Sequence, residues 1–486
     1  MIISLKLPLK EYEFSREVTE LASAFFDDFQ VVINSNQQEE LLVFENDNCQ
    51  IGECLRITSK KEIYETFLSL TKKNLEWGTL TGVRPVKLFH KLAEGLHNVM
   101  ESEMQNGLNA EGQNDIYSKA EIMAGNVIDL VKEKLEKDYY VSSEKIELLR
   151  MLYETEKKCI TEKSANMISV YVSIPFCPSR CSYCSFTSNV PKKDRSDIKT
   201  YLSFLFKEIS RVGEITKILK IQTESIYIGG GTPGILDENE TGELIRNLTE
   251  AFEGAKEITF EAGRPDEVTY KKLKAASDAG ANRICINPQT MNKNVLKACG
   301  RKHSPEDVIE AFKIARNTGF KNINMDLIIG LPEDNSESIL DSIDQIMNLN
   351  PENITVHSLS LKKGSDFMET SLSRISQECP DIFRIVKNKL SEKGYNPYYL
   401  YRQKHMWMNA ENIGYTKEGF ESIFNLQSMA DRQTIIALGA DGISKFVTDQ
   451  GTERFHNPKG LKEYEEHIDD VVKKKTEMIK DSFQFR

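Results

Sequence analysis

Three cysteines stand close together in the segment YVSIPFCPSRCSYCSF: Cys177, Cys181 and Cys184. Their spacing, C-x3-C-x2-C, brings three thiols into eight residues that directly follow an apolar, strand-like run. Thiolate sulfur is the usual ligand of iron–sulfur clusters. Three cysteines on a four-iron cluster leave one iron open to another ligand, so the segment predicts an iron–sulfur site with one open position.

A structural zinc site is the main alternative for these cysteines. Such sites normally complete four ligands with a second cysteine pair or with histidines, and none of the seven histidines lies within the loop. The nine cysteines are an odd number and are scattered along the chain, so we do not expect a disulfide framework. We expect the other six to be ordinary buried or surface thiols: Cys49, Cys54, Cys159, Cys285, Cys299 and Cys379.

A glycine-rich segment and a strand-end acid are further candidates. In Gly229–Pro233, GGGTP, the missing Cβ atoms let backbone N–H and C=O groups approach a ligand closely. The segment fits neither the dinucleotide pattern nor the P-loop pattern, so a plain turn is an equal alternative. Glu261 ends the next strand-like run, and taken alone it is as readily an exposed acid.

The elements that position these residues follow a regular order after Asn166. Strand-like runs and amphipathic segments alternate, which predicts parallel strands joined by right-handed crossovers. The runs are 168–174, 225–228, 257–261, 283–287, 323–329 and 354–359. An α/β architecture is therefore predicted, either an open doubly wound sheet or a complete or partial barrel. In both, ligands gather at the carboxyl ends of the strands, where the cysteine and glycine segments lie.

The regions on either side of these strands have a different pattern. Residues 1–160 combine strand-like runs, at 2–7, 29–33, 40–44 and 55–58, with helical segments, which predicts an N-terminal α+β/helical domain. We expect a barrel core over 161–375. Residues 376–486 contain YNPYYLYRQKHMWMNAENIGY, a strand-like IIALGADGISKF and a final charged helix, and we expect them to cover the substrate at the barrel mouth.

Composition and charge limit the class of protein. With 486 residues, 40% hydrophobic and 28% charged, the chain is typical of a soluble protein of more than one domain. Its net charge of −11 argues against a nucleic-acid partner. No run reaches the roughly 18 to 20 apolar residues of a membrane span, and the first residues lack the apolar segment of a signal peptide, so we expect a cytoplasmic location.

The motifs and their order resemble the radical S-adenosylmethionine (SAM) superfamily. The resemblance implies a partial (β/α)6 TIM-like barrel with a [4Fe-4S] cluster on Cys177, Cys181 and Cys184. It further implies that SAM chelates the open iron through its amino and carboxylate groups. The Gly229–Thr232 loop would then hold the SAM amino group, and Glu261 would contact SAM.

A narrower resemblance is to the oxygen-independent coproporphyrinogen III oxidases, also called coproporphyrinogen dehydrogenases, and their relatives, which include haem chaperones. It is carried by YVSIPFC, IYIGGGTP, FEAGRPD, NRICINPQTMN, NMDLIIGLP and ALGADGIS, which resemble that family's motifs in the same order. Arg301 can fork onto a carboxylate, and Glu261 or Asp326 can accept hydrogen bonds from ribose or amino groups; each alone is more readily a solvated charge. The resemblance implies a shell shared by two SAM molecules, at Tyr171, Tyr183, Gly230, Gly231, Thr232, Glu261, Gln289, Arg301, Asp326, Ser360 and Ile443.

Two positions depart from the oxidases with established chemistry. Those enzymes have a fourth cysteine two residues past the third and a histidine directly before IPFC, where this chain has Phe186 and Ser173. A phenylalanine at the first position also occurs in the haem chaperones. The cysteine loop therefore does not separate the two groups.

Two segments outside the barrel favour the longer, firmicute-type (HemZ-type) coproporphyrinogen dehydrogenases: LTGVRPVKLFHKL and YYLYRQKHMWMNAENIGY resemble that subgroup. They contain four cations that can receive propionate carboxylates: Arg84, Lys87, Arg402 and Lys404. A solvated face explains each of them at least as well.

The resemblance implies a reaction as well as a fold. It is the oxygen-independent oxidative decarboxylation of coproporphyrinogen III to protoporphyrinogen IX, started by a 5′-deoxyadenosyl radical, in porphyrin and haem biosynthesis. The implied partners are a tetrapyrrole substrate and an electron donor such as flavodoxin or ferredoxin. A haem chaperone of the same family and another radical SAM reaction on a tetrapyrrole, such as anaerobic haem degradation, stay open as alternatives.

Overall fold

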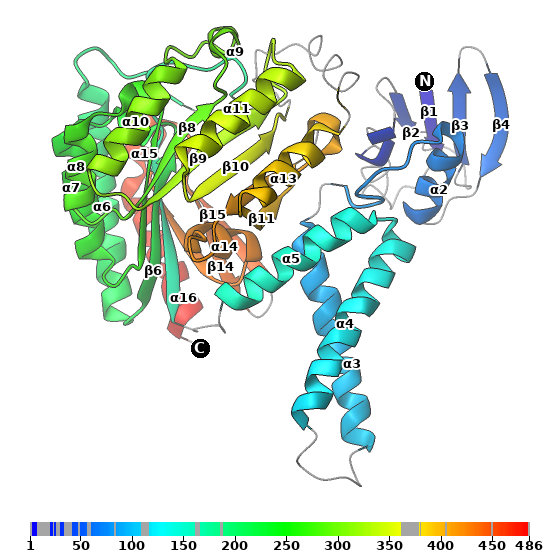
Figure 1. The fold of residues 1–486 in the computed structure, drawn as a ribbon. Helices are drawn as coiled ribbons and strands as arrows, with labels where there is room; N and C mark the ends of the chain where they lie inside the picture. The colour runs from blue at the N-terminus through cyan, green and yellow to red at the C-terminus, as the bar shows by residue number, and fades with distance from the viewer. Residues whose placement is uncertain are drawn as a thin grey trace. The chain divides into compact units, whose positions relative to one another are not determined.

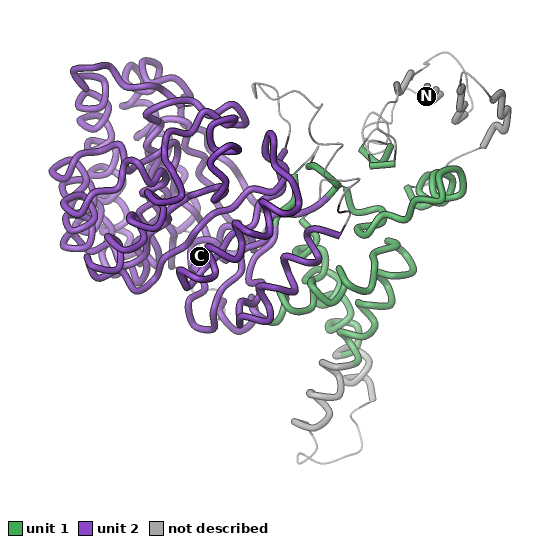
Figure 2. The backbone as a smooth tube through the Cα atoms, turned by 45° about the horizontal axis from the view of Figure 1, so that its top comes forward, with its two compact units in different colours: residues 1–154, 401–409 green, residues 155–400, 410–486 purple. Residues whose placement is uncertain are grey.

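The computed structural model divides the chain into two compact units (Figure 2). Unit 1 comprises residues 1–154 and 401–409, and unit 2 comprises residues 155–400 and 410–486. No helix among the described residues is long and apolar enough to cross a membrane. The described residues are 2–6, 20–22, 24–25, 30–33, 41–46, 49–55, 60–81, 84–107, 116–160, 166–184, 188–360, 379, 381–403, 406–448 and 451–484.

Unit 1 contains a four-stranded sheet of order β2-β1-β3-β4 among its described residues. Its strands are β1 (Ile2–Lys6), β2 (Gln30–Ile33), β3 (Leu41–Asn46) and β4 (Cys49–Leu55). β1 runs parallel to β2 and antiparallel to β3. β4 shares only Leu55 with the strand expected at 55–58, whose other residues lie outside the described residues.

The helices that begin in unit 1 are α2 (Lys60–Thr71), α3 (Pro85–Gly107), α4 (Ile116–Tyr139) and α5 (Ser143–Cys159). α3 and α4 lie side by side as a helical hairpin (Figure 1). Between α2 and α3 the chain turns at Gly78, whose φ of 52° suits glycine and where a Cβ would lie 2.0 Å from the Tyr139 carbonyl oxygen. Trp77 beside it is buried.

Unit 2 is built on an eleven-stranded sheet of order β11-β12-β10-β9-β8-β7-β6-β5-β13-β14-β15. The six strands predicted from the sequence are neighbours in this sheet and pair in parallel, which confirms the α/β prediction. They are β5 (Met167–Ile174), β6 (Gln222–Gly230), β7 (Glu257–Gly263), β8 (Arg283–Gln289), β9 (Asn322–Ile329) and β10 (Asn353–Ser358).

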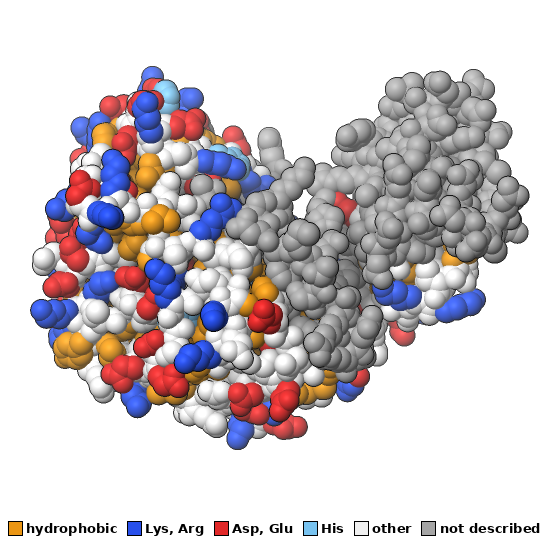
Figure 3. Space-filling view, turned by 90° about the horizontal axis from the view of Figure 1, so that it is seen from above, with side chains coloured by type: hydrophobic (Ala, Val, Ile, Leu, Met, Phe, Trp, Pro, Cys, Tyr) orange, Lys and Arg blue, Asp and Glu red, His pale blue; other side chains and the backbone are white. Residues whose placement is uncertain are grey.

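Helices connect these strands and lie on the outer side of the sheet (Figure 1). They are α6 (Ser196–Ile218), α7 (Glu238–Ala251), α8 (Tyr270–Asp278), α9 (Lys293–Ala298), α10 (Pro305–Asn317) and α11 (Ser336–Leu349). Capping boxes at Asp237, Ser304 and Asn335 fix where α7, α10 and α11 begin. The described surface of unit 2 carries intermingled acidic and basic side chains in the view of Figure 3.

Residues 376–486 add strands to both edges of this sheet. β13 (Thr434–Leu438) pairs in parallel with β5 as a seventh parallel strand, and β14 (Ile443–Thr448) and β15 (Gly451–His456) follow it antiparallel. At the other edge β12 (Asn412–Thr416) pairs antiparallel with β10, next to β11 (Asn396–Tyr401). The division into three domains with a separate cover stays a prediction. The helices here are α13 (Ile382–Glu392), α14 (Ile423–Ala430), α15 (Leu461–Glu466) and α16 (Ile468–Gln484).

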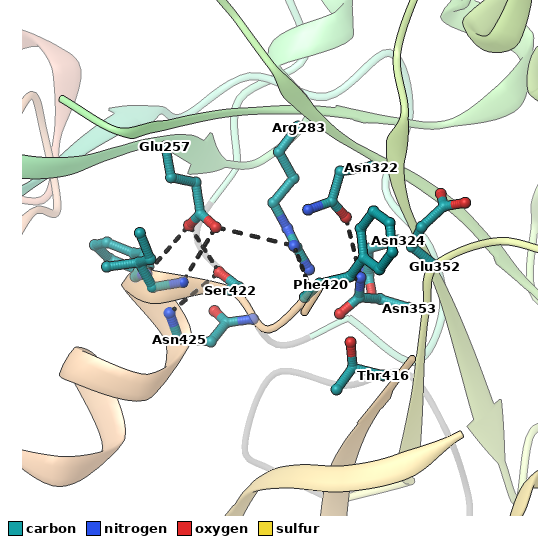
Figure 4. Close-up of polar contacts among 12 residues, drawn as sticks. Glu257, Arg283, Asn322, Asn324, Glu352, Asn353, Thr416, Phe420, Ser422 and Asn425 are labelled. Carbon is teal, nitrogen blue, oxygen red and sulfur yellow. Dashed lines mark hydrogen bonds and ion pairs between the residues drawn. The ribbon is translucent and has the colours of Figure 1, made fainter. Parts of the chain in front are cut away.

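The amino-terminal ends of the parallel strands are closed by the segment before α14 (Figure 4). Glu257, the first residue of β7, accepts hydrogen bonds from the Ser422 hydroxyl at 2.9 Å and from the Phe424 amide at 3.1 Å. Arg283, the first residue of β8, donates to the Phe420 carbonyl at 3.1 Å. The carboxyl ends of the strands are thus the end at which a site can open.

Candidate functional site

The cysteine loop begins directly after β5. The backbone N–H of Cys177 donates to the Asn189 carbonyl at 3.0 Å, and that of Cys184 donates to the Cys181 carbonyl at 3.1 Å. Cys181 is buried. Burial raises the pKa of the Cys177 thiol, whereas the Thr232 hydroxyl, 3.4 Å from its sulfur, acts in the opposite direction. The loop is thus anchored by its backbone hydrogen bonds.

The fit of this loop to an iron–sulfur cluster rests on the chemistry of its donors. Among the described residues, no three His, Cys, Asp or Glu side chains lie close enough together to form a ready-made metal site. The loop nevertheless carries three thiols and no histidine, a donor set that suits an iron–sulfur cluster better than tetrahedral zinc. Cys177, Cys181 and Cys184 are the residues that would hold such a cluster.

The glycine loop after β6 packs directly against the cysteine loop. The Gly231 amide donates to the Ile174 carbonyl at 2.9 Å, and the Thr232 amide donates to the Phe176 carbonyl at 2.7 Å. A Cβ at Gly231 would lie 2.5 Å from the Phe176 oxygen and 3.0 Å from the Cys177 sulfur. Glycine is therefore required here by the contact between the two loops, in addition to any ligand.

Arg301 joins the cysteine loop to β8. Its Nη1 donates to the Tyr183 hydroxyl at 2.8 Å and lies 4.0 Å from the Cys181 sulfur, and its Nη2 donates to the Asn287 carbonyl at 2.7 Å. The side chain is buried, and its Nε has no hydrogen-bond partner among the described residues. Arg301 thus holds two predicted site residues in place, while its expected contact with SAM stays a prediction.

Glu261 lies inside the barrel near the end of β7. Its Oε1 accepts from the Asn287 side-chain amide at 3.0 Å, and its Oε2 is 3.5 Å from the Tyr227 hydroxyl. Burial, and secondly the charge of Asp326, raise the pKa of Glu261 to about 8. At neutral pH this carboxyl group is therefore mostly protonated and can donate a hydrogen bond.

The pKa of Asp326 on β9 is shifted in the opposite direction to that of Glu261. Burial acts to raise its pKa, but the His357 imidazole, the Asn324 amide and the Thr355 hydroxyl together hold the pKa of Asp326 below its usual range. Asn324 Nδ2 donates to Asp326 Oδ1 at 2.7 Å, and His357 Nε2 is 3.8 Å from Asp326 Oδ2. His357 was not among the residues predicted from the sequence. It lies two residues after Thr355, and residues two positions apart lie on the same face of a strand.

Tyr171 lies deeper in the barrel, in a group of three aromatic rings. Its ring centroid is 6.2 Å from that of Tyr227 and 6.1 Å from that of Phe424, and Tyr227 and Phe424 are stacked at 4.8 Å. Phe424 belongs to α14, which the Glu257 contacts hold at the floor of the barrel (Figure 4). The aromatic group therefore separates the carboxyl-end site from the closed amino end.

The other predicted shell residues lie around the same strand ends. Gln289 ends β8 with a φ of 69°, and its Oε1 has no hydrogen-bond partner among the described residues. It lines a small pocket together with Leu327 and Asp334. Ser360 follows β10, and Ile443 begins β14 and is 42% exposed. Phe186 lies outside the described residues.

The four cations predicted outside the barrel are placed differently from one another. Arg402 is buried in unit 1: it donates to the Leu80 carbonyl and, at 2.9 Å, to the Asn409 carbonyl, and its guanidinium lies 5.0 Å from the centroid of Trp77. It is a packing residue of that unit and is not exposed to a substrate. Lys87 is exposed on α3, Arg84 precedes that helix, and Lys404 lies outside the described residues.

Comparison with known proteins agrees with this geometry. Residues 171–346 match the model of the Radical SAM superfamily. The chain is 34% identical over 424 residues to the oxygen-independent coproporphyrinogen-III oxidase-like protein HemZ of Bacillus subtilis, covering 84% of this chain and 78% of that protein. It is 30% identical over 275 residues to the heme chaperone HemW of the same organism, covering 55% and 68%.

Two further matches concern coproporphyrinogen III oxidases. The oxygen-independent enzyme of Pseudomonas aeruginosa is 30% identical over 199 residues, covering 40% of this chain and 43% of that protein. The solved structure of the HemN enzyme of Escherichia coli, described as a radical SAM enzyme, has a TM-score of 0.50 at 21% identity, covering 66% of this chain and 73% of that one. The second match shows the same fold.

Radical SAM proteins use a [4Fe-4S] cluster and SAM, so both cofactors are implied here. The parallel barrel, the three-cysteine loop at the end of its first strand and the extended likeness to HemZ point to the same assignment. The chain belongs to the HemZ-type family of radical SAM proteins, related to the coproporphyrinogen III oxidases.

Proposed function

We propose that this chain catalyses the oxygen-independent oxidative decarboxylation of coproporphyrinogen III to protoporphyrinogen IX. The supporting observation is the extent of its likeness to the oxidase-like protein HemZ, which covers 84% of the chain. That share is larger than residues 161–486 alone can supply, so it includes part of the region before the barrel. The likeness to HemW covers only 55% of the chain.

Within unit 1, the two segments that resemble the HemZ-type subgroup contact each other. The segments are far apart in the sequence, yet Arg402 from the second donates to the Leu80 carbonyl in the first. The same guanidinium lies over the ring of Trp77, a cation–π contact. The segments therefore fold together instead of serving as separate linkers.

The cluster and SAM, when bound, would supply the 5′-deoxyadenosyl radical that takes a hydrogen atom from a propionate side chain. The substrate radical would then lose CO2 and pass one electron to a one-electron acceptor, which leaves a vinyl group. The protein's part is to position the reactants and to exclude water. Phe424, Tyr171 and Tyr227 close the barrel below the site. Glu261 and Asp326 offer a hydrogen-bond donor and an acceptor above them. Two SAM molecules and an electron donor such as flavodoxin or ferredoxin are parts of this proposal.

An anaerobic assay tests the proposal. The full chain, reconstituted with iron and sulfide, is incubated with dithionite, SAM and coproporphyrinogen III, and the porphyrins are separated after oxidation. We expect protoporphyrin to accumulate, and the variant Cys181→Ser to form none. Cleavage of SAM without any loss of carboxyl groups from coproporphyrinogen would remove this assignment.

A haem chaperone is the second candidate, because the matches to HemW are longer than the match to the Pseudomonas oxidase. A titration of the reconstituted chain with haem distinguishes the two functions. Tight binding of haem at one equivalent, with no turnover of coproporphyrinogen, would favour the chaperone. Consumption of haem in the presence of SAM would instead indicate a haem-degrading reaction.

A further inference from the structure

A row of polar side chains crosses the interior of the barrel from β11 to β9. The Tyr399 hydroxyl on β11 donates to the Thr355 hydroxyl at 3.4 Å, and Thr355 donates to Asn324 Oδ1 at 3.0 Å. Asn324 Nδ2 in turn donates to Asp326 Oδ1 at 2.7 Å. Because side chains alternate along a strand, His357 lies on the same face of β10 as Thr355. The row therefore ends at His357 and Asp326, at the carboxyl end of the barrel.

The two residues at this end form a close pair that is still accessible. His357 Nε2 lies 3.8 Å from Asp326 Oδ2, and the two side chains are 23% and 19% exposed. Asn324 holds one oxygen of the carboxylate and His357 faces the other. The interior row thus holds one oxygen of the carboxylate in place.

We propose that His357 is a positioning residue of the nucleotide site. Its imidazole keeps the Asp326 carboxylate oriented and charged, so that Asp326 accepts hydrogen bonds from the ligand while Glu261 donates one. The ligand class is a nucleoside with hydroxyl or amino groups, and the inference rests on the proposed SAM shell. None of the motifs that carry the family resemblance includes His357.

The groups around Asp326 act on its pKa in different directions. Burial favours the neutral form of Asp326, and the neighbouring Glu261 is itself mostly protonated at neutral pH. Cys285 on β8 and Tyr227 on β6 are the other titratable groups that interact with this acid. None of these three groups can carry a positive charge. The His357 imidazole is the group that lowers the pKa of Asp326 most, ahead of Asn324 and Thr355, so the pKa values of Glu261 and Asp326 are shifted in opposite directions.

The pair can be measured directly by infrared spectroscopy of the reconstituted full chain labelled with 13C in the aspartate carboxyl groups. Subtracting the spectrum of Asp326→Asn isolates the band of Asp326. As the pH is lowered, we expect the carboxylate band to give way to a protonated-acid band at a higher pH in His357→Gln than in the wild type. The matched control is His467→Gln, whose residue is 57% exposed on the surface, and it should match the wild type.

The effect on ligand binding is tested with labelled SAM by equilibrium dialysis. Removing His357 raises the pKa of Asp326, so the acceptor is lost as the pH falls. We expect His357→Gln to bind SAM about tenfold more weakly, because the carboxylate is no longer held in place, and the loss should grow as the pH falls. Asp326→Asn should also weaken binding, with no further loss in the double variant.

Two results would overturn the inference: a carboxylate band of Asp326 that is unchanged in His357→Gln, or losses of SAM affinity in the two single variants that simply add in the double variant. The second result would mean that His357 acts independently of Asp326. Neither measurement uses a tetrapyrrole. A chain that fails to convert coproporphyrinogen would therefore remove the proposed function and leave this inference standing.

Discussion

The thiol of Cys177 lies 3.4 Å from the hydroxyl of Thr232. These residues are 55 positions apart, one after β5 and the other after β6, and their contact joins the cysteine loop to the glycine loop. Two parallel neighbours in a sheet bring their carboxyl ends together, which is why the loops meet. The absence of a side chain at Gly231 therefore allows the glycine loop to pack closely against the cysteine loop.

Gly231→Ala should damage the site while leaving the fold in place. The added Cβ would lie 2.5 Å from the Phe176 carbonyl oxygen, so the two loops must move apart. A displacement near 1 Å in an active site costs on the order of 100-fold in rate. Reductive cleavage of SAM by the reconstituted variant, measured as 5′-deoxyadenosine, should fall by about that factor.

Gly95→Ala is the matched control for this substitution. Gly95 lies within α3, and no atom would come within 4 Å of its added Cβ. We expect unchanged SAM cleavage and a gain in stability of up to about 1 kcal/mol from helix propensity. Equal activities of the two alanine variants would show that the contact at Gly231 does not matter.

The raised pKa of Glu261 predicts that, in the absence of SAM, the stability of the folded chain depends on pH. Its pKa of about 8 in the folded chain is above the value of an exposed glutamate, so the folded state holds a proton that the unfolded state releases. Stability is unaffected below the unfolded pKa and falls as the pH rises from there toward 8. Glu261→Gln removes this penalty and should stabilise the chain by up to about 4 kcal/mol near pH 9, with little effect near pH 4.

Thermal and urea unfolding at the two pH values measure this difference. Glu214→Gln is a suitable control, since the Glu214 side chain is 58% exposed and its replacement should be neutral at both values. A stability difference for Glu261→Gln that does not change with pH would mean that the carboxyl group titrates normally.

The buried ion pair between Lys475 and Glu208 predicts a large loss in the free energy of unfolding when the lysine alone is removed. Both side chains are fully buried and form an ion pair between α16 and α6. Glu208 also accepts from the Gly439 amide at 2.7 Å and from the Tyr464 hydroxyl at 2.6 Å. Lys475→Met leaves a buried carboxylate without its cation and should destabilise the chain by about 3 to 5 kcal/mol.

Urea unfolding followed by circular dichroism checks this value. The double variant Glu208→Gln with Lys475→Met should recover part of the loss, because it leaves no buried charge. Lys207→Ala, which breaks an exposed pair with Asp469, should cost less than about 1 kcal/mol. Similar losses for Lys475→Met and Lys207→Ala would contradict this account of the buried pair.

The six parallel strands could be predicted because strand-like segments rich in Ile, Val, Met, Phe or Tyr alternate with amphipathic segments. The strand Thr434–Leu438 has the same character, but nothing local indicates that it lies beside β5, since that pairing joins residues about 265 positions apart. The expectation of a separate carboxyl-terminal cover stays a prediction. Long-range pairing is decided by which sheet edge is free, and that is a property of the whole fold.

The candidate site was predictable to the extent that its residues stand in recognisable segments. Arg402 shows where such reasoning fails, because a cation in a suitable segment can be buried against Trp77 and backbone carbonyls. His357 shows the converse. It belongs to no motif, and only the pairing of β9 with β10 brings it to Asp326.

The central claim is that Cys177, Cys181 and Cys184 hold an iron–sulfur cluster that cleaves SAM. The most direct test is to measure iron, sulfide and reductive SAM cleavage in the anaerobically reconstituted chain and in Cys181→Ser. We predict about four iron and four sulfide per chain with release of 5′-deoxyadenosine in the wild type, and loss of both in the variant. Zinc or no metal in the wild type, or a full cluster in Cys181→Ser, would contradict the account.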